Sequence, residues 1–497
     1  MQIAVYHSQD IQAWEQRWFE KQNSSLGLMQ QVAWSIAIRL DQYIKKSMTQ
    51  STIKIAVWCG CGNNAGDGYY LAQYLQEKGY HVTIFSQAID VNTSSDSLVQ
   101  AVFAAKNNHI HINQHFNVTD DFDCHIDALF GIGLNRELSL DWQAVIQRFN
   151  QQSGLKVALD VPSGIHANTG CTMPVATSVH LTYTILALKQ GLLTGQAKAH
   201  TGQLEVVSLI PTDTELKASA FLTEVKKLPK RVASGHKGSY GHVLVVGGHA
   251  EMGGAVIMAA EAAFSSGAGK VTVICDARHH TAILARSPNI MTKDIQTIEH
   301  DQIHSLLDTA DTVCFGMGLG RDQGSAQIFK SWFDGLMQNQ HIDLVLDADA
   351  LWFLAEHHQN DHQNTILHDN IYCTPHPGEA AKLLGCKTQD IEQDRFDAIY
   401  KLQQRYGGQW VLKGSGSLIL ENNKISICST GNAGMATGGM GDVLSGMIAG
   451  LKAQFHDQIS VADIVTLHGH AGDQLALQGQ RGLQAANMAQ MIVSVVN

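Results

Sequence analysis

Residues Gly431–Gly446 read G-N-A-G-M-A-T-G-G-M-G-D-V-L-S-G. Six glycines surround one acid, Asp442, and the apolar residues after it recur at helical spacing. Glycine lets another group approach the backbone closely. A helix that begins here points unpaired N–H groups and the positive end of its dipole into the loop. The pattern predicts a phosphoryl cradle with a carboxylate that accepts a hydroxyl proton. A flexible glycine-rich turn is the weaker interpretation.

Upstream of this stretch, apolar strands repeatedly lead into turns that carry glycine or aspartate. Such a series is typical of a parallel sheet with a site along one edge. The expected strands are His242–Val246, Val271–Cys275, Thr312–Phe315, Leu344–Leu346, Ile371–Thr374 and Trp410–Leu412.

The first half of the chain has the same α/β style. The expected strands are Ile53–Trp58, His81–Phe85, Phe122–Ile126, Lys156–Leu159 and Leu204–Leu209. Asn64, Asp127, Asp160 and Ser163 follow three of these strands, so they are expected to converge on one crevice at the carboxyl edge. Their oxygen ligands suit a hard cation. For any single acid, capping of the next helix is the alternative.

The overall composition excludes several classes of protein. The 497-residue chain is 44% hydrophobic, has a formal charge of −11 and contains no dense Lys/Arg run. These features argue against nucleic acid or an anionic membrane as a partner. The N-terminus does not resemble a signal peptide, and no apolar run is long enough to span a bilayer. Nine scattered cysteines predict reduced thiols in a cytoplasmic protein.

Three motifs of the first half resemble the YjeF N-terminal, NAD(P)H-hydrate epimerase family. They are G-N-N-A-G-D-G (62–68), D-A-L-F-G-I-G (127–133) and D-V-P-S-G (160–164). The second half is similar to the ADP/ATP-dependent NAD(P)H-hydrate dehydratases of the ribokinase-like superfamily. Its motifs are G-M-G-L-G (316–320), T-P-H-P-G-E (374–379), K-G-S-G-S (413–417) and A-T-G-G-M-G-D-V-L-S-G (436–446). Bifunctional repair enzymes carry the two domains in this order.

The resemblance implies a Rossmann-like three-layer αβα domain in residues 1–215, a linker in 216–230 and a ribokinase-like α/β domain in 231–497. The first domain would interconvert the R and S epimers of hydrated NADH and NADPH. The second would dehydrate the S epimer to NAD(P)H at the expense of ADP, giving AMP and phosphate. The small molecules NADHX, NADPHX and ADP are the implied partners. Apolar helical stripes within residues 8–46, together with the family, predict a homo-oligomer.

In the epimerase domain, the resemblance implies that Asp160 transfers a proton and that Asn64, Asp127 and Ser163 bind K⁺. Ala65 departs from the family's usual glycine; a left-handed backbone there would make its methyl group costly. The implied contacts to the hydrate are Asn63, Asn64, Ala65, Gly66, Asp67, Gly131, Ile132, Gly133, Leu134, Asn135, Arg136, Glu137 and Asp160.

In the dehydratase domain, the resemblance implies that Asp442 is the catalytic base and that Mg²⁺ is required. The implied contacts to the hydrate are Ala255, Gly318, His376 and Asp442. The implied nucleotide contacts are Lys413, Gly414, Ser415, Gly416, Ser417 and Gly441. A small-molecule kinase of the same superfamily, joined to a non-catalytic nucleotide-binding domain, is the alternative, since it would share Asp442 and the glycine-rich loop.

Overall fold

The computed structural model describes residues 3–50, 52–118, 120–360 and 366–497, which form two compact units. One unit comprises Ala4–Ala220, and the other comprises Phe221–Asn497 together with Ile3. The division falls inside the stretch 216–230 where the sequence predicts a linker, although part of that stretch forms the strand β9 (Ala220–Leu222). None of the helices described combines the length and the apolar character that a bilayer crossing requires.

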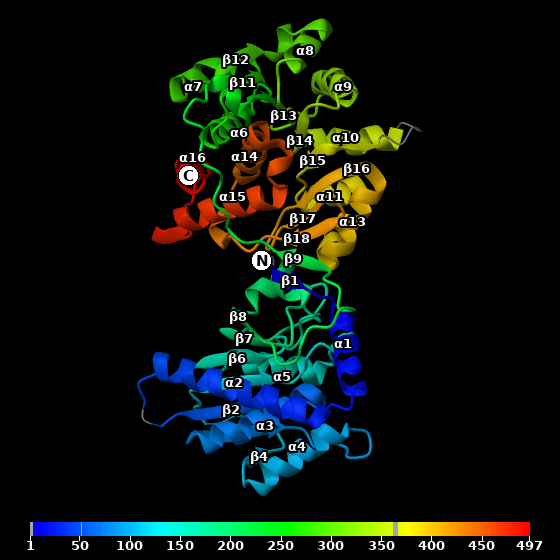
Figure 1. Ribbon diagram of the computed structural model, residues 1–497, viewed down its shortest axis with the longest axis vertical. Helices are drawn as coiled ribbons and strands as arrows, with labels where there is room; N and C mark the ends of the chain where they lie inside the picture. Colours follow the sequence, from blue (N-terminus) through cyan, green and yellow to red (C-terminus); the bar gives the residue numbers. More distant parts are fainter. Residues whose placement is uncertain (1–2, 51, 119, 361–365) are drawn as a thin grey trace. The chain divides into compact units, whose positions relative to one another are not determined.

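The N-terminal unit is built on a seven-stranded parallel sheet of order β4-β3-β2-β5-β6-β7-β8 (Figure 1). Its strands are β2 (Lys54–Cys59), β3 (His81–Ser86), β4 (His111–Asn113), β5 (Cys124–Ala128), β6 (Leu155–Leu159), β7 (Leu181–Ile185) and β8 (Gln203–Val207). Its helices are α1 (Ser8–Glu20), α2 (Ser25–Ser47), α3 (Asn63–Glu77), α4 (Asp96–Asn107) and α5 (Leu140–Gln151).

Alternate residues of β2 pack into different cores, because successive side chains of a strand point to opposite faces of the sheet. Ile55 and Val57 join the core formed with α2, α3 and α4. Ala56 and Trp58 join the aromatic core formed with α5, in which the Trp58 and Phe149 ring centroids are 5.5 Å apart. The unit therefore has the predicted three layers, with the sheet in the middle.

The sheet of the C-terminal unit has the strand order β9-β18-β17-β16-β15-β14-β13-β10-β11-β12. The run from β16 to β12 is parallel, and β17 and β18 add antiparallel strands beside β16. The remaining strands are β1 (Ile3–Val5), β10 (His242–Val246), β11 (Lys270–Cys275), β12 (Met291–Asp294), β13 (Thr312–Phe315), β14 (Asp343–Leu346), β15 (Leu367–Cys373), β16 (Gly407–Leu412), β17 (Leu418–Glu421) and β18 (Lys424–Ile427).

Helices cover both faces of this sheet, which confirms the predicted α/β class. One face packs against α6 (Gly253–Ser265), α14 (Met440–Phe455) and α15 (Val461–Leu475), with α16 (Met488–Val495) against α6 and α15. On the other face, stacked phenylalanines join β13 to α9 (Gln323–Gln338) and α10 (Asp349–Asn360). The other helices are α7 (His280–Arg286), α8 (His300–Leu307), α11 (Pro377–Leu384), α12 (Thr388–Gln393) and α13 (Arg395–Tyr406).

Gly446 lets α14 lie directly against α6. A Cβ at this position would overlap the carbonyl oxygen of Ala259, a backbone atom that cannot move aside. We expect Gly446→Ala to destabilise the C-terminal unit. Overpacking lowers the free energy of unfolding by about 1–3 kcal/mol, and we expect the upper end of this range because a backbone atom is in the way. This loss exceeds the gain of about 1 kcal/mol that alanine brings to a helix in place of glycine. Urea unfolding measures the change. Gly254→Ala, on α6 with no atom within 4 Å of the added methyl group, is the control and should not destabilise the unit.

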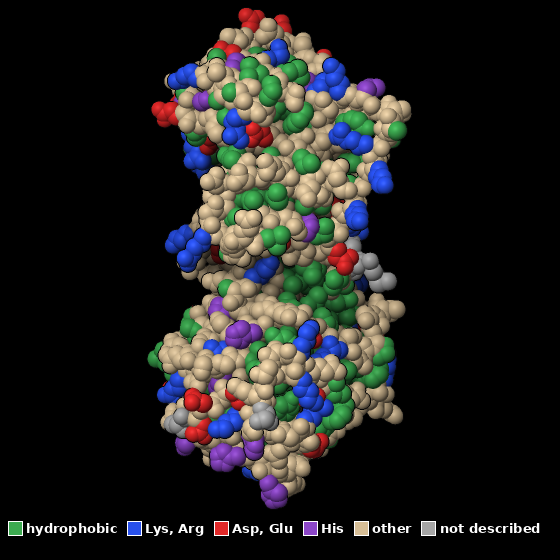
Figure 2. All heavy atoms as spheres, turned by 90° about the vertical axis from the view of Figure 1, so that its left-hand side faces the viewer, with side chains coloured by type: hydrophobic (Ala, Val, Ile, Leu, Met, Phe, Trp, Pro, Cys, Tyr) green, Lys and Arg blue, Asp and Glu red, His purple; other side chains and the backbone are tan. Residues whose placement is uncertain are grey.

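The surface and the cysteines agree with the composition. On the face drawn in Figure 2, Lys and Arg side chains are dispersed rather than gathered into one broad basic area. All nine cysteines are free thiols, and six of them are buried. Burial raises the pKa of Cys59, Cys124 and Cys314, so these thiols resist ionisation and behave as small apolar side chains.

Candidate active sites

A cavity of about 420 Å³ lies at the carboxyl edge of the N-terminal sheet. Most of the predicted hydrate contacts of this half line it, and α1 contributes further residues. The lining residues are Ile11, Gln12, Glu15, Gly62, Asn63, Asn64, Asp67, Leu129, Phe130, Gly131, Ile132, Gly133, Leu134, Asn135, Arg136, Asp160, Ile185, Leu186 and Lys189. Three predicted contacts do not line it: Ala65 and Gly66 are buried in α3, and Glu137 is exposed.

Ala65 does not require the left-handed backbone that would penalise its methyl group. It lies in the first turn of α3 and is fully buried. A right-handed helical backbone accepts alanine without strain. The departure from the family's usual glycine is therefore compatible with the local structure.

Asp160 forms a buried ion pair with Lys189. The Lys189 Nζ–Asp160 Oδ1 distance is 2.5 Å, and the two side chains are 1% and 9% exposed. The same ammonium group donates to Thr184 Oγ1 at 3.1 Å and to the carbonyl oxygen of Ile185 at 2.5 Å. Asp160 also accepts backbone N–H bonds from Ile185 (3.1 Å, to Oδ1) and Ile132 (3.3 Å, to Oδ2). These donors hold the Asp160 carboxyl group in one orientation.

The three predicted K⁺ ligands are buried oxygen donors. Asp127 accepts hydrogen bonds from the backbone N–H and the hydroxyl of Ser163, at 2.8 and 2.5 Å, and from Thr177 Oγ1 at 2.5 Å. Burial raises the pKa of Asp127, and these hydrogen bonds oppose the rise. Asn64 Oδ1 is buried and has no hydrogen-bond partner among the residues that the structure describes, while Asn64 Nδ2 donates to the carbonyl oxygen of Leu159 at 3.3 Å. An unpartnered amide oxygen fits a hard monovalent cation, so the donor set fits K⁺.

In the C-terminal unit, charged side chains gather beyond the carboxyl ends of β14 and β16. Asp347 is 2% exposed and accepts from Lys413 Nζ at 2.9 Å and from Ser445 Oγ at 2.7 Å. Glu379 lies 3.9 Å from the same ammonium group. Burial raises the pKa of Glu379 to about 7, and Lys413 opposes the rise. The cluster therefore contains one carboxylate tied to lysine and a second carboxyl that titrates near neutrality.

Asp442 lies in the first turn of α14, as the sequence predicts. Gly439, with φ of +92°, precedes the helix in a left-handed conformation that favours glycine. The first N–H groups of the helix have no intrahelical acceptors and carry the positive end of its dipole. Burial raises the pKa of Asp442 to about 7, with the charge of Asp347 adding to the rise and Lys413 opposing it. The loop therefore combines anion-binding donors with a carboxyl that can exchange a proton at neutral pH.

The predicted nucleotide contacts lie together. Gly414 and Ser417 form a tight turn through two hydrogen bonds, of 3.2 and 3.1 Å. The fully buried Arg395 of α13 donates to the carbonyl oxygens of Leu412 and Lys413, which fixes the start of this turn. A Cβ at Gly441 would lie 3.1 Å from Lys413 Nζ, so the turn and the glycine-rich loop meet at this lysine.

Three of the predicted hydrate contacts of the C-terminal unit, Ala255, Gly318 and His376, lie where a ligand could reach His376 and where Ala255 and Gly318 are neighbours. A Cβ at Gly318 would lie 3.3 Å from Ala255 Cβ, so these two residues are neighbours. His376 caps α11: its Nδ1 accepts from the N–H groups of Gly378 and Glu379, and its own N–H donates to Glu379 Oε2 at 2.8 Å. The His376 side chain is 57% exposed, so it is not a buried core histidine, and a ligand could contact its ring.

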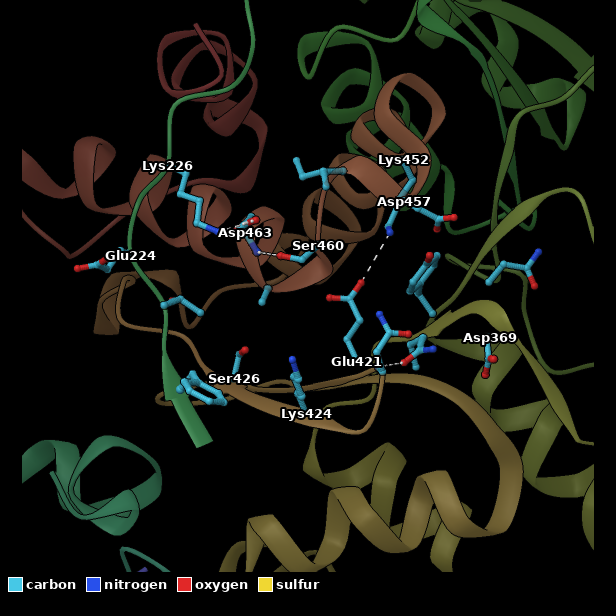
Figure 3. A pocket seen from close by; sticks show the side chains of 18 of the residues that line it. Glu224, Lys226, Asp369, Glu421, Lys424, Ser426, Lys452, Asp457, Ser460 and Asp463 are labelled. Atoms are coloured by element: carbon cyan, nitrogen blue, oxygen red, sulfur yellow. Dashed lines mark hydrogen bonds and ion pairs between the residues drawn. The ribbon is translucent and has the colours of Figure 1, made fainter. Parts of the chain in front are cut away.

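A larger cavity, of about 820 Å³, opens near the starts of β15 and β16, away from the carboxyl edge (Figure 3). No predicted site residue lines it. Lys452 lies 3.7 Å from Glu421 and 4.6 Å from the ring centroid of Tyr372, and Glu421 also accepts the N–H of Val461 at the start of α15. These buried charges join α14, β17 and α15, which is a structural role.

The sequence did not single out several residues of these sites. Lys189 stands in the apolar run L-A-L-K (186–189), and a lysine in such a run is a signal of a buried, paired charge. Glu15 lies on a helix interpreted as core or interface. Asp347 directly follows the expected strand Leu344–Leu346, and Glu379 ends the motif T-P-H-P-G-E (374–379), but neither has an assigned role. Arg395 follows no recognisable motif.

Comparison with known proteins matches a different family model to each of the two units. A family model described as NAD(P)H-hydrate dehydratase matches residues 243–494, and one described as YjeF-related protein N-terminus matches residues 25–191. The bifunctional NAD(P)H-hydrate repair enzyme of Coxiella burnetii is 39% identical over 455 residues, which cover 89% of this chain and 90% of the relative. The enzyme of the same name from Escherichia coli is 35% identical over 89% of this chain and 84% of its own. A crystal structure of the Bacillus subtilis ADP/ATP-dependent NAD(P)H-hydrate dehydratase, co-crystallised with ATP and Mg²⁺, is 25% identical over 54% of this chain and 93% of its own, with a TM-score of 0.46.

Proposed function

The chain belongs to the family of bifunctional NAD(P)H-hydrate repair enzymes, and from this premise we propose that each unit carries one activity. The N-terminal unit epimerises hydrated NADH and NADPH, and the C-terminal unit dehydrates the S epimer to NAD(P)H with ADP as phosphoryl donor. The observation that supports this most strongly is Asp442 in a glycine-rich helix start beside Lys413 and Asp347.

In the dehydratase unit, Asp442 accepts the proton of the ring hydroxyl as that oxygen attacks the β-phosphoryl group of ADP. Hydroxide is a poor leaving group, whereas phosphate leaves readily when the ring nitrogen donates its electron pair and a C=N⁺ bond forms. Loss of a proton from the neighbouring ring carbon to solvent then forms the C=C bond of NAD(P)H and returns the electron pair to nitrogen. The N–H groups of Gly441 and its neighbours stabilise the transferring phosphoryl group, and Lys413 compensates its charge. Glu379 and Asp347 would hold Mg²⁺ through their carboxylate oxygens, and the ion would neutralise charge on the phosphates.

The protonation state of Asp442 sets the expected pH dependence. Only the carboxylate can accept a proton, and burial raises the pKa of this group to about 7. We therefore expect kcat/KM for the S epimer to fall about tenfold per pH unit below that value and to level off above it. A pH profile of NADH recovery measures this. A rate that increases as the pH falls would contradict Asp442 as the base.

In the epimerase unit, Asp160 acts as the proton-transfer group at the hydroxyl-bearing carbon. Asn64, Asp127 and Ser163 would hold K⁺, which supplies a fixed positive charge beside the substrate. We expect replacement of K⁺ by tetramethylammonium to reduce the rate of R-epimer repair. The rate of S-epimer repair, which does not require epimerisation, should stay unchanged. Equal rates for the R epimer in both salts would contradict the ion site.

The central experiment gives the purified chain hydrated NADH, ADP and Mg²⁺ and follows the near-ultraviolet absorbance of NADH. We expect both epimers to be repaired. Repair of the S epimer alone would contradict the epimerase proposal, and repair of neither would contradict both. A stable phosphate ester as the product would instead favour the small-molecule kinase. We further propose that the enzyme is cytoplasmic, since its cysteines are free thiols, and that it forms a homo-oligomer, as the resemblance to the family implies.

A further inference from the structure

Helix α1 forms part of the N-terminal cavity, although it lies outside residues 25–191 that the family model matches. Glu15 is on the side of this helix that lines the cavity. The helix is held in place by long-range contacts. Arg17 Nε lies 2.8 Å from Asp213 Oδ2, Trp14 Nε1 donates to the carbonyl oxygen of Pro211 at 3.1 Å, and the N–H of Ser8 donates to Asn168 Oδ1 at 2.7 Å. The position of Glu15 is therefore set by the fold.

The surroundings of Glu15 favour its protonated form. Burial raises the pKa of its carboxyl, the charge of Asp160 adds to the rise, and Lys189 opposes it. Within the described part of the chain, the Glu15 side chain forms no ion pair or hydrogen bond. A carboxyl of this kind retains its proton to higher pH than an exposed one and can donate it to a bound ligand.

Asp160 has the opposite surroundings in the same cavity. Its carboxylate is paired with the Lys189 ammonium group and accepts two backbone N–H bonds. One cavity therefore holds two carboxyls with different surroundings: among the described residues Glu15 has no ion-pair partner, whereas Asp160 is held by Lys189 and two backbone N–H groups. An unpaired carboxyl and a paired one in the same cavity can take the two roles of acid–base catalysis.

We propose that Glu15 is a catalytic acid of the epimerase and acts together with Asp160; this inference rests on the epimerase activity proposed above. The Glu15 carboxyl protonates the hydroxyl oxygen of the hydrate as the C–O bond breaks. Water departs, and the ring nitrogen supplies the electron pair that forms a C=N⁺ bond. A water molecule then adds to the other face of that carbon and gives a proton to Asp160, and the nitrogen recovers its electron pair. Proton exchange with solvent then returns Glu15 and Asp160 to their starting protonation states. In the conversion of the S epimer to the R epimer, Asp160 acts as the acid and Glu15 as the base.

Asp67 is the other carboxyl that could serve as the acid. It also lines the cavity, and burial raises its pKa well above the ordinary range. It belongs to α3 and to the predicted hydrate-binding segment, whereas Glu15 approaches from α1. A comparison of Glu15→Gln with Asp67→Asn therefore separates the two.

The test uses the full chain with ADP, Mg²⁺ and each epimer in turn, with the rate of the enzyme-free reaction subtracted. Glu15→Gln is expected to lower kcat for repair of the R epimer by about 100-fold or more, with KM changed less than about threefold. Repair of the S epimer, which needs only the other unit, should be unchanged and shows that the chain is folded. Glu15→Asp should retain more activity than Glu15→Gln, because it keeps a carboxyl. Glu20→Gln, an exposed position at the end of α1, should match the wild type.

Three results would overturn the inference: an unchanged kcat in Glu15→Gln, an effect on KM alone, or full loss in Asp67→Asn with none in Glu15→Gln. A wild-type chain that repairs only the S epimer would instead contradict the proposed epimerase activity. The proposed C–O cleavage replaces the hydroxyl oxygen of the hydrate by an oxygen from water. When the reaction runs in H₂¹⁸O, ¹⁸O should therefore enter the hydroxyl group of the hydrate at the rate at which the epimers interconvert. Epimer exchange without label would contradict that step.

Discussion

Asp442→Asn is expected to lower the rate of ADP-dependent recovery of NADH from the S epimer by at least about 10²–10⁴-fold, the usual contribution of a general base. The amide has nearly the shape of the carboxylate but cannot accept the hydroxyl proton. Loss of transition-state interaction predicts a fall in kcat, with a much smaller change in KM. The measurement is a stopped assay of NADH absorbance at pH 8, where the wild-type carboxyl is mostly ionised.

The same substitution should not destabilise the fold. The pKa of Asp442 is raised because burial and the carboxylates of Asp347, Glu379 and Asp349 oppose its charge. These effects outweigh the helix dipole, which favours a first-turn acid by about 0.3–1 kcal/mol. The unfolding temperature of Asp442→Asn should therefore equal or exceed that of the wild type. Epimer exchange by the other unit is the internal control. A variant that kept full dehydratase activity would contradict the role of base.

The fold could be predicted where the sequence pattern is local. The strands His242–Val246 and Thr312–Phe315 were predicted to the residue, because each is an apolar run between polar or glycine-bearing turns. The strand Leu181–Ile185 was missed, since its sequence L-T-Y-T-I interleaves threonine with apolar residues and no glycine turn follows it. The β17–β18 hairpin was missed as well. Its turn places Asn422 and Asn423 at φ of 52° and 59°, a conformation that asparagine tolerates and that signals a hairpin.

The candidate sites divide in the same way. Asp442, Lys413 and Asp160 stand in short motifs after strands, so their positions could be predicted from neighbouring residues alone. Lys189 and Glu15 reach the N-terminal cavity only through tertiary packing. Glu15 belongs to α1, which is distant in sequence from the strands that lead into the motifs. The ion-pair partner of Asp160, Lys189, could not be identified without the fold, because it comes from the segment after β7 and belongs to no quoted motif.

Asp160→Asn is expected to lower the rate of R-epimer repair by about 10²–10⁴-fold, as much as Asp442→Asn lowers S-epimer repair. Repair of the S epimer should continue in the Asp160 variant. Asp160 has φ of +65°, a left-handed conformation that asparagine also adopts readily, so the substitution adds no backbone strain. The amide cannot accept the proton that the reaction transfers. Epimer exchange, followed by chromatographic separation of the R and S hydrates, measures the loss directly.

Asp160→Asn also removes the anionic partner of Lys189, whose side chain is 1% exposed. The ammonium group then has only neutral acceptors among the described residues: Thr184 Oγ1, the carbonyl oxygen of Ile185 and the new amide oxygen. Loss of one member of a buried ion pair costs about 3–5 kcal/mol, so the N-terminal unit should unfold at a lower temperature. The double variant Asp160→Asn/Lys189→Met removes both charges and should recover part of that stability without recovering epimerase activity. This comparison separates chemistry from folding. If the double variant repaired the R epimer at the wild-type rate, Asp160 would not be the proton-transfer group.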